Sequence, residues 1–178
     1  SSAMAGGGFI FAGTDLMARA DRNEGPEYLR AQLLESGKKR NNPALVDAFV
    51  SHQLEAYEFL KGHGAKFKLN ALDPCLHETG TGRVITNLHI AARAHPNITF
   101  ASKCAGMKLL RDPDSGRVSE VMVAFGDQAM SIAVNRAVVL ATGGFSRSPE
   151  LLGVFAPELL GAVKHGGVAN TGDGLMMA

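Results

Sequence analysis

Apolar residues recur with a helical period in the first third of the chain. The pattern predicts helices over residues 15–20, 26–37 and 43–62. Pro26 and Pro43 stand at first-turn positions, where proline is favoured because its missing N–H would have no helical partner. The third helix carries an apolar stripe that we interpret as a packing face, formed by Leu45, Phe49, Leu54, Tyr57 and Leu60.

Short strands replace this pattern after Gly64. Residues 137–141 read Ala-Val-Val-Leu-Ala without a polar interruption, which is typical of a strand buried on both faces. No internal repeat is present, and no linker divides the chain into independent domains. The other elements expected, in order, are a strand at 65–69, a loop at 70–82, a helix at 84–94 and strands at 98–100, 104–110, 118–125 and 130–134.

Composition and charge exclude several classes of protein. Hydrophobic residues make up 46% and charged residues 20% of the 178 positions, so the chain can bury a core and is not mainly disordered. No apolar stretch approaches the roughly 18 residues that a membrane span needs. The net charge of +1 gives no broad basic surface for nucleic acid. Cys75 and Cys104 form neither a disulfide framework nor a metal pattern, so we expect a reducing, cytoplasmic location.

Glycine clusters are the strongest chemical signal. The apolar run 137–141 ends in Thr142-Gly143-Gly144, and open α/β sheets bind ligands at the carboxyl ends of such strands. Glycine lets a ligand approach the main chain, and the threonine can hydrogen-bond a phosphate or a ring oxygen. The alternative is a left-handed turn that simply follows a core strand.

Two further segments have the same character. Residues 1–8, Ser-Ser-Ala-Met-Ala-Gly-Gly-Gly, offer unobstructed N–H groups that can surround an anion or line a planar ring. Runs of this kind at an N-terminus are otherwise often tags. Residues 170–174 read Asn-Thr-Gly-Asp-Gly, and Asp173 can either cap a following helix or accept a hydrogen bond from a ribityl or ribose hydroxyl.

Taken together, these segments resemble the FAD-dependent fumarate reductase / succinate dehydrogenase flavoprotein family, which includes the 3-ketosteroid dehydrogenases. The resemblance extends over essentially the whole chain, in the order and spacing of the family. The segments that carry it are residues 1–7, 45–67, 98–123, 141–145, 149–151 and 171–178.

The resemblance implies an α/β fold, the central part of a Rossmann-like FAD-binding domain with a helical N-terminal segment and a β-meander. Residues 1–178 would be an incomplete domain, because the family's G-x-G-x-x-G segment, capping domain and C-terminal flavin segment are not in this sequence. The implied activity is that of an FAD-dependent oxidoreductase. It would transfer hydride between flavin N5 and an activated C–C bond, as in fumarate reduction or ketosteroid dehydrogenation, and the isolated chain would be inactive.

A small-molecule substrate is implied, and the electron donor or acceptor is left open. The residues by themselves also allow a non-catalytic α/β module that binds a nucleotide or a protein. No nucleic acid partner, membrane span or metal is expected.

Site residues follow from the same resemblance. Ala5 and Gly6 would place their main chain against the isoalloxazine ring, and Gly6 would also lie near the substrate. No catalytic residue is expected within the chain except one candidate, His77, just before the glycine loop 79–82; a surface loop histidine is the alternative. The cofactor contacts implied are Ser1, Ser2, Ala5, Gly6, Gly7, Gly106, Ala141, Thr142, Gly143 and Asp173.

Overall fold

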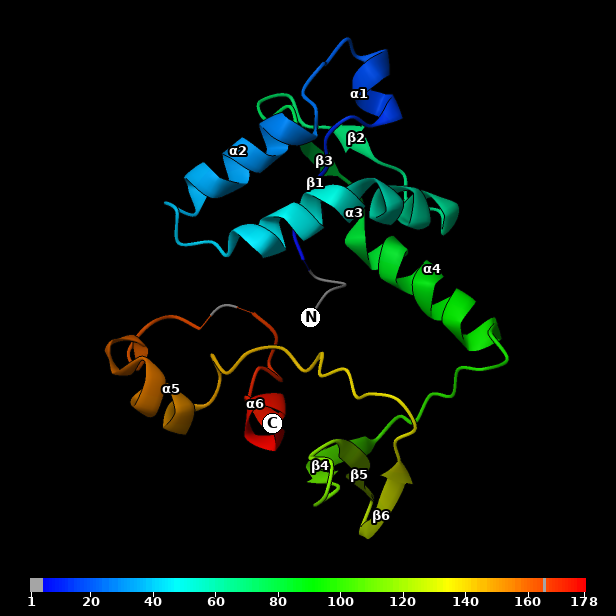
Figure 1. The fold of residues 1–178 in the computed structure, drawn as a ribbon, viewed down its shortest axis with the longest axis vertical. Coiled ribbons are helices and arrows are strands. Elements are labelled where there is room, and N and C mark those ends of the chain that lie inside the picture. Colours follow the sequence, from blue (N-terminus) through cyan, green and yellow to red (C-terminus); the bar gives the residue numbers. More distant parts are fainter. Residues whose placement is uncertain (1–4, 165) are drawn as a thin grey trace. The chain divides into compact units, whose positions relative to one another are not determined.

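The computed structural model describes residues 5–164 and 166–178 and divides into two compact units (Figure 1). The N-terminal unit extends to Thr99 and the C-terminal unit runs from Phe100 to Ala178. The boundary falls between a helix and a strand, where residues 98–100 do not form the strand expected from their sequence. Among the described residues, no helix is long and apolar enough to cross a membrane.

The N-terminal unit combines four helices with a small antiparallel sheet, in which β3 lies between β1 and β2. The three helices predicted at residues 15–20, 26–37 and 43–62 are confirmed. The expected loop at 70–82 contains strand β3. The elements are β1 (Gly8–Ile10), α1 (Asp15–Arg19), α2 (Pro26–Ser36), α3 (Pro43–Gly62), β2 (Lys68–Leu69), β3 (Leu76–Glu78) and α4 (Thr81–Ala94).

Side-chain caps fix where two of these helices begin. The Thr14 hydroxyl accepts a hydrogen bond from Met17 N at 3.3 Å at the start of α1, and Asn42 Oδ1 accepts one from Ala44 N at 3.0 Å at the start of α3. These bonds satisfy N–H groups that have no partner inside the helix. The chain direction on entering each helix is therefore set by a local polar residue.

The buried face of α3 agrees only in part with the apolar stripe expected from the sequence, since Tyr57 belongs to both. Val46, Gln53 and Tyr57 are buried, whereas Leu45 is 69% exposed and Phe49 46% exposed. The reason is Gln53, a polar residue that hydropathy assigns to the surface. Its side-chain amide pairs with both main-chain groups of Ala12, each at 3.0 Å, and so satisfies a buried segment.

The C-terminal unit contains a three-stranded meander and short helices. Strand β5 lies between β4 and β6, and all pairings are antiparallel. The predicted meander is confirmed, and helix α5 begins at Pro149 behind the cap Ser148. The elements are β4 (Cys104–Arg111), β5 (Val118–Phe125), β6 (Gln128–Ala133), α5 (Pro149–Phe155), the 3₁₀ helix η2 (Pro157–Leu159) and α6 (Asp173–Met177).

The buried strand expected at residues 137–141 is not formed. Val139 is 87% exposed and Leu140 39% exposed, and this segment pairs with none of the described strands. A strand needs a partner for its main-chain N–H and C=O groups. An apolar sequence therefore indicates where a strand can form but does not supply its neighbour.

Candidate functional site

In the N-terminal unit, the glycine segment at residues 5–8 is hydrogen-bonded to residues 79–81, where α4 begins. Thr79 N donates to Gly7 O at 3.0 Å, and the Thr81 hydroxyl donates to Ala5 O at 2.8 Å. Gly7 has φ +85°, and a Cβ atom there would clash with the Thr79 carbonyl oxygen. Glycine is thus required at position 7 by the packing of the two loops. Ser1 and Ser2, both expected to contact the cofactor, lie outside the described residues.

Gly6 differs from Gly7 in its surroundings. It is exposed, and a Cβ atom built there would meet no atom within 4 Å. Nothing described in this chain therefore requires glycine at position 6. Exposed main chain without a side chain is the arrangement expected where a flat ligand approaches closely.

In the C-terminal unit, two glycine segments lie against each other. Gly172 N donates to Gly144 O at 3.1 Å, which joins residues 141–144 to residues 170–174. Gly143 has φ +83°, and a Cβ atom there would lie 2.6 Å from Asn170 Oδ1. A Cβ atom at Gly174 would clash with the Thr142 hydroxyl. The two motifs identified separately in the sequence are thus parts of one structure.

Asp173 is the first residue of α6 and does not cap it. The cap position belongs to Gly172, which has φ +85°, and no side chain caps this helix. The capping role considered for Asp173 is therefore wrong. Its carboxylate is exposed, and Oδ1 accepts a hydrogen bond from the Thr171 hydroxyl at 2.9 Å. The remaining carboxylate acceptors face no described donor.

Gly106 lies on β4, beside a shift in the pairing register with β5. A Cβ atom there would be 3.2 Å from Met177 Sδ, so this glycine lets α6 pack closely on β4. Figure 1 shows the red helix α6 beside β4. The C-terminal unit thus contains five of the expected cofactor residues, namely Gly106, Ala141, Thr142, Gly143 and Asp173.

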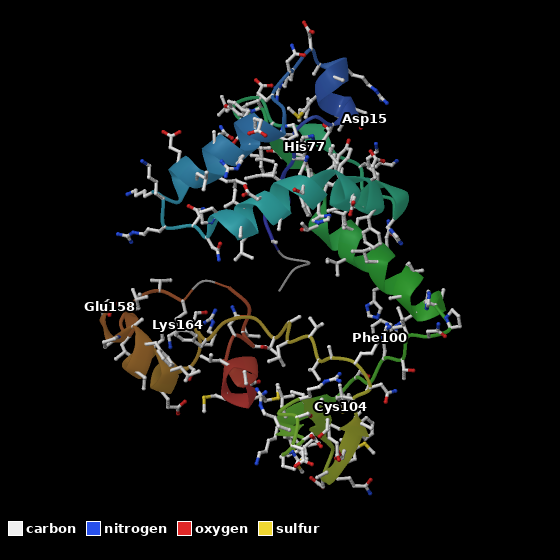
Figure 2. The ribbon with its side chains drawn as sticks, in the orientation of Figure 1. Asp15, His77, Phe100, Cys104, Glu158 and Lys164 are labelled. Atoms are coloured by element: carbon white, nitrogen blue, oxygen red, sulfur yellow. The ribbon has the colours of Figure 1, made fainter. Side chains whose placement is uncertain are left out.

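His77 is buried in the N-terminal unit and is not the surface loop residue considered above (Figure 2). Its Nδ1 is 2.9 Å from Cys75 O, which can only accept, so Nδ1 carries the proton. In the neutral ring Nε2 then accepts from the Thr14 hydroxyl at 2.8 Å. Burial lowers the pKa of His77 below its usual value of 6.5.

Both ring nitrogens of His77 are therefore occupied by groups of this unit. Phe11, Tyr57 and Phe67 surround the ring with centroids 5.5, 5.6 and 6.2 Å away. The arrangement suits a structural histidine that connects β3 to the cap of α1. A catalytic role for His77 stays a prediction, and it would require one of these two hydrogen bonds to be exchanged.

A charged cluster that the sequence did not reveal connects α1 to α3. The Tyr57 hydroxyl and Lys61 Nζ both donate to Asp15 Oδ1, at 2.7 and 2.9 Å. These hydrogen bonds lower the pKa of Asp15 to about 2, the Tyr57 bond having the larger effect. Burial, together with the bond to Asp15, raises the pKa of Tyr57 to about 12. Positions 15 and 57 are too far apart in sequence for any local pattern to pair them.

The expected cofactor residues fit a flavin dinucleotide in one respect that the structure tests. Apart from Gly7, those that are described are exposed: Ala5, Gly6, Gly106, Ala141, Thr142, Gly143 and Asp173. Gly144 is exposed too, and a Cβ atom there would meet nothing within 4 Å. Accessible amides, a hydroxyl and a free carboxylate acceptor match the phosphate, ring and hydroxyl groups of FAD.

Comparisons with known proteins agree with these features. The profile of a family described as "FAD binding domain" matches residues 1–178. A fumarate reductase (cytochrome) from Shewanella frigidimarina is 26% identical over 98% of this chain and 32% of its own length. The open conformation of a flavocytochrome c3 fumarate reductase has the same fold, with a TM-score of 0.88, 20% identity and coverage of 99% of this chain and 33% of that one.

A second solved structure with this fold is a 3-ketosteroid-Δ4-(5α)-dehydrogenase from Rhodococcus jostii RHA1 bound to 4-androstene-3,17-dione. Its TM-score is 0.87 at 19% identity, over 99% of this chain and 45% of that chain. The chain therefore belongs to the FAD-binding domain family, as its glycine segments indicated, and FAD is the cofactor of this domain. It spans about a third of the length of the curated relatives it matches.

Proposed function

We propose that this chain contributes the FAD-binding surface of an oxidoreductase that acts on an activated C–C bond. The observation that carries the proposal is the set of exposed main-chain and carboxylate groups around Thr142, Gly144 and Asp173. Support comes from the family and from relatives named fumarate reductase and ketosteroid dehydrogenase. The proposed reaction is hydride transfer between flavin N5 and carbon, in fumarate or other enoate reduction or in ketosteroid-type dehydrogenation.

Bound FAD supplies the redox chemistry, and the protein supplies binding and orientation. In this proposal Ala5 and Gly6 present main chain to the flavin ring, with Gly6 also bordering the substrate. Gly106, Ala141, Thr142 and Gly143 line the rest of the cofactor. Asp173 accepts a hydrogen bond from a cofactor hydroxyl through the carboxylate acceptors that Thr171 leaves unused. Location in the cytoplasm and a small-molecule substrate are part of the same proposal.

Asp173→Asn tests this placement because it keeps the shape of the side chain and removes its charge. A hydrogen bond to a charged acceptor stabilises by about 1.5–3 kcal/mol, against about 1 for a neutral one. We therefore expect FAD affinity to fall about tenfold, while the melting temperature of the apoprotein barely changes. Flavin titration followed by fluorescence measures the affinity.

Asp127→Asn is the matched control, since Asp127 is an exposed turn residue of the β5–β6 hairpin. It should change neither quantity. A lower melting temperature of Asp173→Asn with unchanged FAD affinity would remove Asp173 from the site. The non-catalytic module considered from the sequence would be supported instead if the full-length protein were purified without flavin and did not take it up.

A further inference from the structure

The N-terminal unit contains a groove of about 330 Å³ beside α2, a volume within the range of small-molecule sites. The helix residues Leu29, Gln32, Leu33 and Ser36 line it, and their i, i+3, i+4, i+7 spacing places them on one helix face. Leu29 is fully buried and belongs to the core of the unit, and Leu33 packs against that core. With Ile10 of β1, they give the groove an apolar floor.

Most of the polar side-chain atoms at the groove are oxygen acceptors. Gln32 Nε2 donates to the Tyr28 hydroxyl at 2.9 Å, and the Ser36 hydroxyl donates to Leu33 O at 3.1 Å. The Ser36 hydroxyl thus keeps its oxygen lone pairs for a ligand, and Gln32 keeps Oε1 as an acceptor and its second amide N–H as a donor. The other polar lining residues, Glu35 and Asp73, carry carboxylates, which only accept when ionised.

The charged side chains that line the groove are both acidic. No lysine, arginine or histidine lines it, and neither Glu35 nor Asp73 forms an ion pair with a described residue. Asp73 is held in place because its Oδ1 accepts from Cys75 N at 2.9 Å. Arg22, which lies close to Asp73, donates to main-chain carbonyls, that of Asp73 among them, and not to the carboxylate.

We propose that this groove binds a small organic ammonium ion that carries an apolar chain. The ammonium group, with three donors and a positive charge, complements Glu35 and Asp73, and the alkyl chain covers Ile10 and Leu33. The ligand class follows from charge complementarity together with the apolar floor. The groove contains none of the residues assigned to FAD, so the inference is independent of the proposed function.

The test uses n-hexylammonium as probe, with hexanoate and 1-hexanol as matched compounds of the same chain length. Calorimetric titration of the holoprotein should show saturable binding of hexylammonium and weaker or no binding of the other two. In spectra of methyl-labelled protein, signals of Ile10, Leu29 and Leu33 should shift with the same concentration dependence. Equal binding of hexanol or hexanoate, or shifts spread over other methyl groups, would overturn the proposal.

Variants then test whether the carboxylates of Glu35 and Asp73 bind the ammonium group. Glu35→Gln with Asp73→Asn should weaken hexylammonium binding roughly tenfold or more, because charged acceptors become neutral ones. Asp73→Asn keeps Oδ1 as the acceptor for Cys75 N, so the loop should stay folded. Glu27→Gln, on the same helix but outside the groove, should leave binding unchanged. Wild-type affinity in the double variant would contradict the assignment of the ammonium position.

Discussion

The two units of this chain are stabilised in different ways. The N-terminal unit has a core of buried side chains that includes Met17, Leu29, Tyr57 and His77, all of them inaccessible to solvent. In the C-terminal unit, Val123 and Leu152 are the only hydrophobic side chains of the described residues that are buried. Its two glycine segments are joined instead through main-chain hydrogen bonds. Side-chain packing thus forms one unit, and close main-chain approach organises the other.

The same difference applies to the residues that we propose as FAD contacts in each unit. Ala5 and Gly6 are exposed next to Gly7, and this segment is positioned by the Thr81 hydroxyl, which donates to Ala5 O, and by Thr79 N, which donates to Gly7 O. Thr142 and Gly143 are positioned by contacts with a second glycine-containing loop. A substitution in the N-terminal core should therefore act on stability, whereas one in the C-terminal loops should act on the cofactor.

The largest effect is expected for Met17→Ala, which removes a fully buried side chain from the N-terminal core. Truncations of this kind cost about 2–5 kcal/mol of unfolding free energy. Met176→Ala, in the C-terminal unit at 71% exposure, is the matched control and should cost well under 1 kcal/mol. Similar losses in both variants would contradict the contrast between the units.

In the 178-residue chain, intrinsic fluorescence can measure the effect of Met17→Ala, and circular dichroism that of Met176→Ala. The sequence has no tryptophan and two tyrosines, Tyr28 and Tyr57, both within the N-terminal unit. Tyrosine emission during urea unfolding therefore reports on that unit alone. Circular dichroism follows both units, so a difference between the two signals would show that they unfold separately.

A smaller effect is expected from pH, and it should be confined to the N-terminal unit. Because burial holds the pKa of His77 below 6.5 in the folded state, the unfolded chain binds a proton more readily. The free energy of unfolding therefore does not depend on His77 above about pH 6.5, and it decreases as the pH is lowered from there towards the pKa of His77 in the folded state. The loss amounts to about 1.4 kcal/mol for each unit by which the pKa is lowered.

His77→Gln should remove this dependence between pH 8 and pH 5. Asp15, with a pKa of about 2, stays ionised throughout that range and does not contribute. The measurement is tyrosine-detected urea unfolding of wild type and variant at several pH values. An unchanged pH dependence in the variant would mean that another group titrates, and that His77 is already protonated or accessible in the fold.

Local signals in the sequence predicted the parts of the fold that depend on neighbouring residues. Pro26 and Pro43 located the starts of α2 and α3, and the turn residues after β4 and β5 located the meander. The glycine segments identified the family because their order and spacing belong to FAD binding. Each of these features is readable within a few positions of the chain.

Contacts between distant residues could not be predicted in this way. The bond of His77 to Thr14 and the pairing of Gln53 with Ala12 join positions 63 and 41 apart. A hydropathy pattern does not predict polar residues at buried positions such as Gln53, which explains why Tyr57 of the expected stripe on α3 is buried while Leu45 and Phe49 are exposed. The strand predicted at 137–141 is not formed for a different reason. The segment is apolar, but no described strand pairs with it.

The central claim is that exposed glycine main chain receives FAD, and flavin retention by Gly144→Ala tests it most directly. Gly143 is unsuitable because its φ of +83° would strain any other residue. At Gly144 the backbone is not in that region, and a Cβ atom meets no described atom within 4 Å, as at the control position Gly161. The quantity measured is the flavin-to-protein ratio of the purified holoprotein, beside the melting temperature of the apoprotein. We expect Gly144→Ala to lose flavin at an unchanged melting temperature while Gly161→Ala keeps it; full flavin content in Gly144→Ala would contradict the account.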